Sequence, residues 1–187
     1  MSVKCTWRMR MNIRDYWSTT HNSYFNLLLL LEQMFNPLTA SSSKSLVGHQ
    51  NSVTGVCISP NRQLLFSASI DASVRLWSLH TWSNLVVYRG HAFPVWSVHC
   101  GPLGASNYFV SGGADRTARL YIVDQSQPVR IFAGHAADVD AVQMHPNAHY
   151  VATGCGDRIV RLFDVRIGQC QRIITGHRVR SCGHTTD

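Results

Sequence analysis

Four of the five Gly-His dipeptides in the chain lie at nearly constant spacing, and this regularity constrains the fold more than any other feature. The four copies are separated by 42, 44 and 42 residues and lie at Gly48-His49, Gly90-His91, Gly134-His135 and Gly176-His177. In each of the first three units an Asp follows the His by 22 to 24 residues, an aromatic residue follows that Asp by six, and a Pro lies 11 residues after the His. Landmarks that keep register over three units indicate an internal structural repeat.

Each unit contains four short runs of apolar or β-branched residues between turns rich in Gly, Pro, Asp and Asn, which is the signature of strands. The expected strands cover residues 53–58, 64–69, 74–77 and 85–88 in the first unit, 95–100, 108–113, 118–121 and 129–132 in the second, and 139–144, 150–155, 160–163 and 171–174 in the third. Four strands in about 42 residues correspond to one propeller blade. The sequence therefore predicts an all-β fold.

Units of Gly-His, then Ser or Thr four residues before Asp, then Arg-Leu-aromatic resemble WD repeats, and the resemblance covers residues 46–177. It implies a WD-repeat β-propeller that is incomplete, with about three four-stranded blades of an expected seven, at 46–89, 90–133 and 134–175. The literal Trp-Asp pair does not occur, and only Phe163-Asp164 keeps its Asp. Residues 1–45 form a non-repeat segment, and residues 178–187 form a divergent tail.

The resemblance also implies a buried hydrogen-bond relay in each blade, running from a loop His to a strand Ser or Thr, a turn Asp and a strand aromatic. The relay positions are His49, Ser67, Asp71 and Trp77; His91, Ser111, Asp115 and Tyr121; and His135, Thr153, Asp157 and Phe163. Indole and phenol groups can donate a hydrogen bond, but Phe163 cannot. We therefore expect the third relay to be weaker, by the roughly 0.5–1.5 kcal/mol that one hydrogen bond contributes.

The recurrence of His, Ser and Asp raises the question of catalysis. An enzyme needs one preorganised site, whereas three equivalent copies at blade spacing indicate a framework, and no unique nucleophile or phosphate-binding glycine loop stands out. Six cysteines show no metal-ligand spacing, and Cys182 with His184 supplies two ligands where metal sites use three or four. We predict a non-enzymatic protein without cofactor or metal.

Binding of partner proteins is the better functional interpretation. In WD propellers the residues that follow Gly-His face the open end of the channel and commonly contact partners, and here the candidates are Thr54, Pro94, Trp96, Asp138 and Asp140. Trp96 is the strongest candidate because exposed Trp is enriched at binding hot spots. The alternatives are that Trp96 packs between blades and that Asp138 and Asp140 are solvated loop residues.

The charge of the chain does not indicate a nucleic-acid surface. The net charge is +7, but it is spread along the chain and no segment forms a basic patch. The longest apolar run, residues 27–31, is far shorter than the roughly 20 residues of a membrane span. Basic residues precede that run, but Asp15 and the lack of a small-residue cleavage site argue against a signal peptide. We expect neither sequence-specific nucleic-acid binding nor membrane insertion.

Longer stretches carry a narrower resemblance. Tyr-Arg-Gly-His-Ala-Phe-Pro-Val-Trp at 88–96, and residues 108–120, 130–139 and 145–154, resemble the WD-repeat TBP-associated factors of the general transcription factor TFIID, which also occur in SAGA-like histone acetyltransferase coactivators. This resemblance implies a nuclear scaffold that assembles with histone-fold TBP-associated factors, or with acetyltransferase subunits, during RNA polymerase II initiation. The alternative is a WD adaptor of another pathway, such as ubiquitin ligation or ribosome biogenesis, because fold alone does not fix function.

Both ends depart from that family. Residues 1–45 match neither its N-terminal domains nor a blade, and the fourth Gly-His continues into a stretch without the Val expected four residues after the His. We therefore expect a fragment, a splice product or an imperfect gene model. Residues 24–35 are compatible with a short helix that Asn36-Pro37 would end. This segment has either no role or the role of covering the first blade.

Overall fold

The computed structural model describes residues 24–26, 45–102 and 107–177, and every regular element among them is a β-strand. The first blade contains β3 (Val53–Ile58), β4 (Leu64–Ser69), β5 (Val74–Ser78) and β6 (Asn84–Tyr88). The second contains β7 (Val95–Cys100), β8 (Tyr108–Gly113), β9 (Ala118–Ile122) and β10 (Arg130–Phe132). The third contains β11 (Val139–Met144), β12 (Tyr150–Cys155), β13 (Val160–Asp164) and β14 (Cys170–Ile174). These are the strands that the repeat predicts, with ends that differ by a residue.

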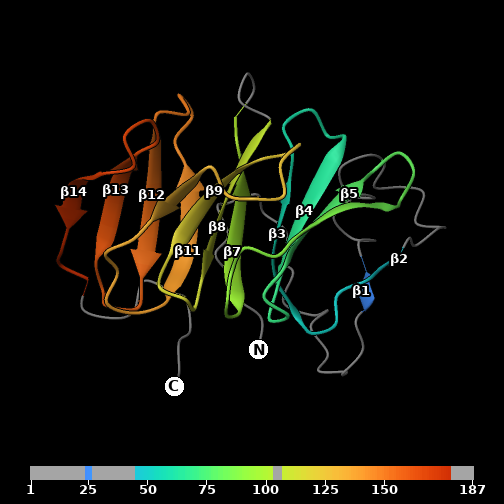
Figure 1. The fold of residues 1–187 in the computed structure, drawn as a ribbon, viewed down its shortest axis with the longest axis horizontal. Coiled ribbons are helices and arrows are strands. Elements are labelled where there is room, and N and C mark those ends of the chain that lie inside the picture. Colours follow the sequence, from blue (N-terminus) through green and yellow to red (C-terminus); the bar gives the residue numbers. More distant parts are fainter. Residues whose placement is uncertain (1–23, 27–44, 103–106, 178–187) are drawn as a thin grey trace, which may run out of the picture.

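Each blade is a four-stranded antiparallel sheet in which the strands pair in chain order. The first strands of the three blades, β3, β7 and β11, lie beside one another, and the sheets fan outward from them (Figure 1). The architecture is therefore a partial β-propeller, as the sequence predicts. A separate two-stranded sheet pairs β1 (Tyr24–Asn26) with β2 (Ser45–Val47). Residues 24–26 are thus extended where the sequence suggested the start of a helix, and the rest of that segment lies outside the described residues.

Two apolar layers hold the blades together. The first lies between blades 1 and 2, where Phe66, Leu76 and Tyr88 pack against Val95 and Phe109. A second joins blades 2 and 3 in the same way, with Leu120 and Phe132 on one side and Val142, Val151 and Phe163 on the other. Side chains alternate between the two faces of each blade along a strand. Blade 2 lies between the other two and therefore has two buried faces.

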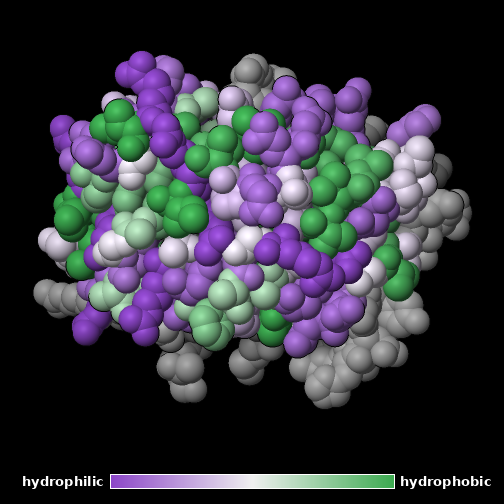
Figure 2. Space-filling view, in the orientation of Figure 1, coloured by the Kyte–Doolittle hydropathy of each residue, from purple (hydrophilic) through white to green (hydrophobic). Residues whose placement is uncertain are grey.

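One face of blade 3 has no counterpart to these layers among the described residues. Strand register places Val160, Leu162 and Ile174 on this face. Leu162 occupies the repeat position of Leu76 and Leu120, which are 1% and 2% exposed, yet Leu162 itself is half-buried. Ile174 is 51% exposed, and apolar side chains reach the surface at this end of the molecule, near β13 and β14 (Figure 2). We refer to Val160, Leu162 and Ile174 as the open face of blade 3.

The first strand of every blade carries a β-bulge after its first residue. Pairing passes from Val53 to Gly55, and the equivalent skip omits Trp96 in β7 and Asp140 in β11. The omitted residues are Thr54, Trp96 and Asp140, three of the five predicted partner-contacting residues. Because a bulge re-aims the side chain of the extra residue, this repeated irregularity sets the direction of the candidate binding residues.

Candidate functional site

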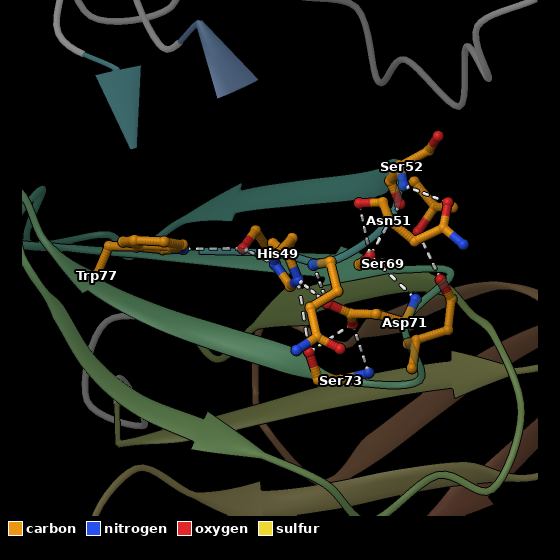
Figure 3. Close-up of polar contacts among 11 residues, drawn as sticks. His49, Asn51, Ser52, Ser69, Asp71, Ser73 and Trp77 are labelled. Carbon is orange, nitrogen blue, oxygen red and sulfur yellow. Dashed lines mark hydrogen bonds and ion pairs between the residues drawn. The ribbon is translucent and has the colours of Figure 1, made fainter. Parts of the chain in front are cut away.

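The relay of blade 1 is a continuous chain of hydrogen bonds between two turns and two strands (Figure 3). The His49 ring contacts the Asp71 carboxylate through Nδ1 at 2.9 Å and the Ser67 hydroxyl through Nε2 at 2.7 Å. The Trp77 indole N–H donates to the same Ser67 oxygen at 2.8 Å. A carboxylate only accepts, so Nδ1 carries the proton and Ser67 donates to Nε2. Each group in the chain thus fixes the direction of the next hydrogen bond.

Further donors surround the Asp71 carboxylate. The Ser73 hydroxyl donates to it at 2.5 Å, and the Ser73 and Gln50 backbone N–H groups donate at 3.0 Å. Burial alone would raise the pKa of Asp71, but the hydrogen bonds from Ser73, Gln50 and His49 lower the pKa to about 2. Burial lowers the pKa of His49 against the effect of Asp71. The relay therefore holds a carboxylate and a neutral imidazole at neutral pH.

Blade 2 repeats this geometry with one additional charged group. His91 contacts Asp115 at 2.8 Å and Ser111 at 2.7 Å, and the Thr117 hydroxyl donates to Asp115 at 2.7 Å. The Arg119 guanidinium also pairs with Asp115, at 3.1 Å, and donates to the Gly90 carbonyl. Burial opposes ionisation of Asp115, yet hydrogen bonds from His91 and Thr117 hold its pKa well below the usual range.

The relay of blade 3 is less complete than the sequence predicts. His135 contacts the Thr153 hydroxyl at 2.8 Å, but its Nδ1 atom has no hydrogen-bond partner. Asp157 instead pairs with Arg161 at 2.8 Å. Burial, followed by the Arg161 charge, lowers the pKa of His135 to about 4. The relay is thus interrupted between His and Asp, in addition to the donor that Phe163 cannot supply.

Two further groups shape these relays and were not among the predicted relay residues. One is the Arg four residues after each Asp, which pairs with Asp115 and Asp157. The other is the residue two after each Asp, where a hydroxyl donates in blades 1 and 2 but Ile159 stands in blade 3. The signal was present in both cases, because the Arg recurs in Arg-Leu-aromatic and the hydroxyl recurs in two units.

The order Ser–His–Asp matches the connectivity of a catalytic triad, but the accessibility of the hydroxyls does not. Ser67 is 2% exposed, and Ser111 and Thr153 are fully buried. A nucleophile must reach its substrate, and the Ser67 oxygen also accepts the Trp77 N–H. In blades 1 and 2 the geometry therefore stabilises the blade by tying the Asp turn to a strand. Among the described residues, no group of three or more His, Cys, Asp or Glu side chains is placed to hold a metal ion.

The candidate partner-contacting residues lie together at one end of the blades. Backbone bonds join Ser52 to Ile70, Pro94 to Ala114 and Asp138 to Gly156, so the start of each first strand lies against the turn that contains the relay Asp. We call this end, formed by Thr54, Pro94, Trp96, Asp138 and Asp140 beside those turns, the rim.

Three of the rim residues, Thr54, Trp96 and Asp138, take part in contacts between neighbouring blades. The Thr54 hydroxyl donates to the Val95 carbonyl at 2.5 Å, and the Trp96 indole N–H donates to Asp138 at 3.2 Å. The structure thus brings Trp96 and Asp138 together across the boundary between blades 2 and 3. All five rim residues are half-buried. Part of each residue is therefore buried, and part remains accessible.

Comparison with known proteins identifies the repeat. The family model for the WD domain, G-beta repeat, matches residues 40–78, 82–121 and 126–164. The chain belongs to the WD40 repeat family. Its relatives include a TFIID subunit 5 from Caenorhabditis elegans, which is 41% identical over 120 residues, covering 64% of this chain and 18% of that protein. The described part of this WD40 chain contains no helix suited to crossing a membrane.

Two further relatives show similarity over shorter segments. A TFIID subunit 5 from Encephalitozoon cuniculi is 41% identical over 91 residues, which are 49% of this chain and 16% of that protein. A eukaryotic translation initiation factor 3 subunit I from Pyricularia oryzae is 34% identical over 76 residues, which are 41% of this chain and 22% of that protein. The matched region spans less than a quarter of each of these three relatives.

Proposed function

We propose that this chain is a non-catalytic scaffold subunit of an RNA polymerase II transcription-initiation complex or a histone acetyltransferase coactivator complex, and that it acts in the nucleus. The observation that carries this proposal is the 41% identity to a TFIID subunit 5 over 120 residues, which exceeds the identity to the translation factor over a shorter segment. The partners would be other TBP-associated factors, including histone-fold subunits, or acetyltransferase subunits.

The rim is the surface through which we propose that these partners bind. Two of its bulged residues, Thr54 and Trp96, are held by contacts with the neighbouring blade. Side chains fixed in this way lose little conformational entropy when a partner binds. The rim joins an aromatic ring to the carboxylates of Asp138 and Asp140, a combination suited to a partner segment with apolar and basic side chains.

Affinity purification of the tagged chain from nuclear extract, followed by mass spectrometry, tests the proposal. We expect TFIID or acetyltransferase subunits with the wild-type chain. Trp96→Ala should reduce their recovery several-fold, whereas Ile173→Ala, a truncation of an apolar side chain that is 61% exposed on an outer strand, should not. Thermal unfolding followed by circular dichroism verifies that both variants fold. Equal recovery with both folded variants would show that the rim does not bind these subunits.

A second candidate is a WD adaptor of another pathway, which the similarity to translation initiation factor 3 subunit I favours. Recovery of translation-factor, ubiquitin-ligase or ribosome-assembly proteins without any TBP-associated factor would establish this candidate and refute the first.

Enzymatic use of the relays makes a different prediction, because Asp71→Asn combined with Asp115→Asn would then leave a folded but inactive protein. We expect instead that this double variant loses folding stability.

A further inference from the structure

The boundary between blades 1 and 2 contains two free cysteines that contact each other across neighbouring strands. Cys57 lies on β3 and Cys100 on β7. The Cys57 sulfur accepts the Cys100 backbone N–H at 3.1 Å. The Cys100 thiol lies 3.0 Å from the Ile58 carbonyl oxygen, and the Cys57 thiol lies 3.7 Å from the same oxygen. Both sulfurs therefore converge on one backbone atom at the blade boundary.

The hydrogen bond from the Cys100 N–H to the Cys57 sulfur has an equivalent at the boundary between blades 2 and 3. The repeat position of Cys57 is held by His99 in blade 2, and His99 Nδ1 accepts the Met144 backbone N–H at 3.4 Å. The repeat positions of Cys100 are Ile58 and Met144. The acceptor of the backbone N–H is thus a thiol between blades 1 and 2 and an imidazole between blades 2 and 3. The residue that donates this N–H is a second cysteine at the first boundary and Met144 at the second.

The two thiols differ in accessibility and acidity. Cys57 is half-buried, whereas Cys100 is 5% exposed and belongs to the apolar layer between the blades. A hydrogen bond from the Cys100 thiol lowers the pKa of Cys57, against the effect of burial and with help from the Cys100 N–H. The interaction with Cys57, together with burial, raises the pKa of Cys100. Because the thiolate is the nucleophile in thiol–disulfide exchange, Cys57 is the attacking group.

We propose that Cys57 and Cys100 form a thiol–disulfide exchange site that closes to a covalent link between blades 1 and 2 in the presence of a small disulfide. The Cys57 thiolate attacks one sulfur of the small disulfide, which forms a mixed disulfide and releases one small thiolate. Cys100 then gives up its proton and attacks the Cys57 sulfur, which releases the second small thiolate. The two protein thiols lose two electrons and two protons, and the small disulfide gains them as two small thiols.

Peptide mapping of the folded full-length chain tests this site. The chain is treated with oxidised glutathione, its remaining thiols are alkylated, and it is digested with trypsin without reduction. Cleavage after Lys and Arg places Cys57 alone in peptide 45–62 and Cys100 alone in peptide 90–116. We expect these two peptides to be joined, at a mass two hydrogens below their sum. Cys170, which is exposed, serves as an internal control that takes up glutathione without this partner.

Two variants separate the attacking thiol from the resolving thiol. Cys100→Ala should stop at the mixed disulfide, with glutathione retained on Cys57. In Cys57→Ala, Cys100 should remain reduced in the folded chain, at least tenfold less modified than in a urea-unfolded sample. In the wild-type chain, a reduced Cys57 while Cys170 carries glutathione would refute the proposal, as would a persistent mixed disulfide at Cys57 or the joining of either peptide to a different cysteine. These wild-type outcomes decide the question even if a variant fails to fold.

Discussion

The hydroxyl of Ser67 is the group on which the first relay most depends, and Ser67→Ala measures what that relay contributes. The substitution removes one oxygen, yet it leaves the Trp77 indole N–H and the His49 Nε2 atom without their partner. All three residues are less than 5% exposed, so water does not readily replace the hydroxyl. Each buried unpaired group costs about 1–3 kcal/mol. We expect Ser67→Ala to lower the free energy of unfolding by about 2–6 kcal/mol.

Guanidinium denaturation followed by circular dichroism measures this loss, and a double-mutant cycle with Trp77→Phe locates its origin. In the Ser67→Ala background the indole N–H is already unpaired, so Trp77→Phe should cost about 1–2 kcal/mol less than in the wild-type chain. Ser83→Ala removes an exposed hydroxyl that contacts Thr81 and should change stability by less than about 0.5 kcal/mol. Equal costs of Trp77→Phe in both backgrounds would refute the idea that the relay is a coupled network.

Four other perturbations test the packing, the protonation states and the turns. Leu120→Ala should destabilise by about 2–5 kcal/mol but Leu162→Ala by about 1 kcal/mol or less, because only Leu120 is fully buried; chemical denaturation compares them. The pKa of His135 in the folded chain is about 4, so on acidification the unfolded chain binds a proton before the folded chain does. The free energy of unfolding should therefore fall by about 2 kcal/mol from pH 6.5 to 4, and His135→Asn should flatten this pH dependence. The pKa of Asp71 in the folded chain is about 2, so the stabilisation that its carboxylate provides should persist above pH 4 and disappear between pH 4 and 2. The Asp71→Asn variant lacks this carboxylate and should not show that loss. Arg116 has a φ of 61°, so Arg116→Gly should raise the melting temperature, and an unchanged or lower value would contradict strain in this turn.

The sequence predicts the blades well because their signals are local and repeated. Gly-His, Asp and the aromatic residue mark turns and strands at fixed offsets, and chain-order pairing of adjacent strands leaves little freedom in topology. The relays of blades 1 and 2 follow for the same reason, since the fixed offsets bring His49 to Ser67 and Asp71 and bring His91 to Ser111 and Asp115.

The remaining features depend on contacts between side chains that no offset encodes. Ile159 stands where Ser73 and Thr117 donate to their Asp, and Arg161 takes the carboxylate that His135 would have bound. The contact between Trp96 and Asp138 is similar, because it depends on which side chains meet where blades 2 and 3 pack.

Blades 2 and 3 differ in how they are stabilised, and this difference bears on the scaffold role. In repeat proteins each unit is stabilised by itself and by its neighbours. Blade 2 has a complete His–Asp contact, an additional Arg119–Asp115 pair and an apolar layer on both faces. Blade 3 has an interrupted relay and an open face with Ile174 exposed. Since Trp96 belongs to blade 2 and reaches toward Asp138 of blade 3, a partner bound at this part of the rim would contact both blades. Such a partner would add contacts across the boundary between blades 2 and 3. Binding at the rim and the stability of blade 3 should therefore reinforce each other.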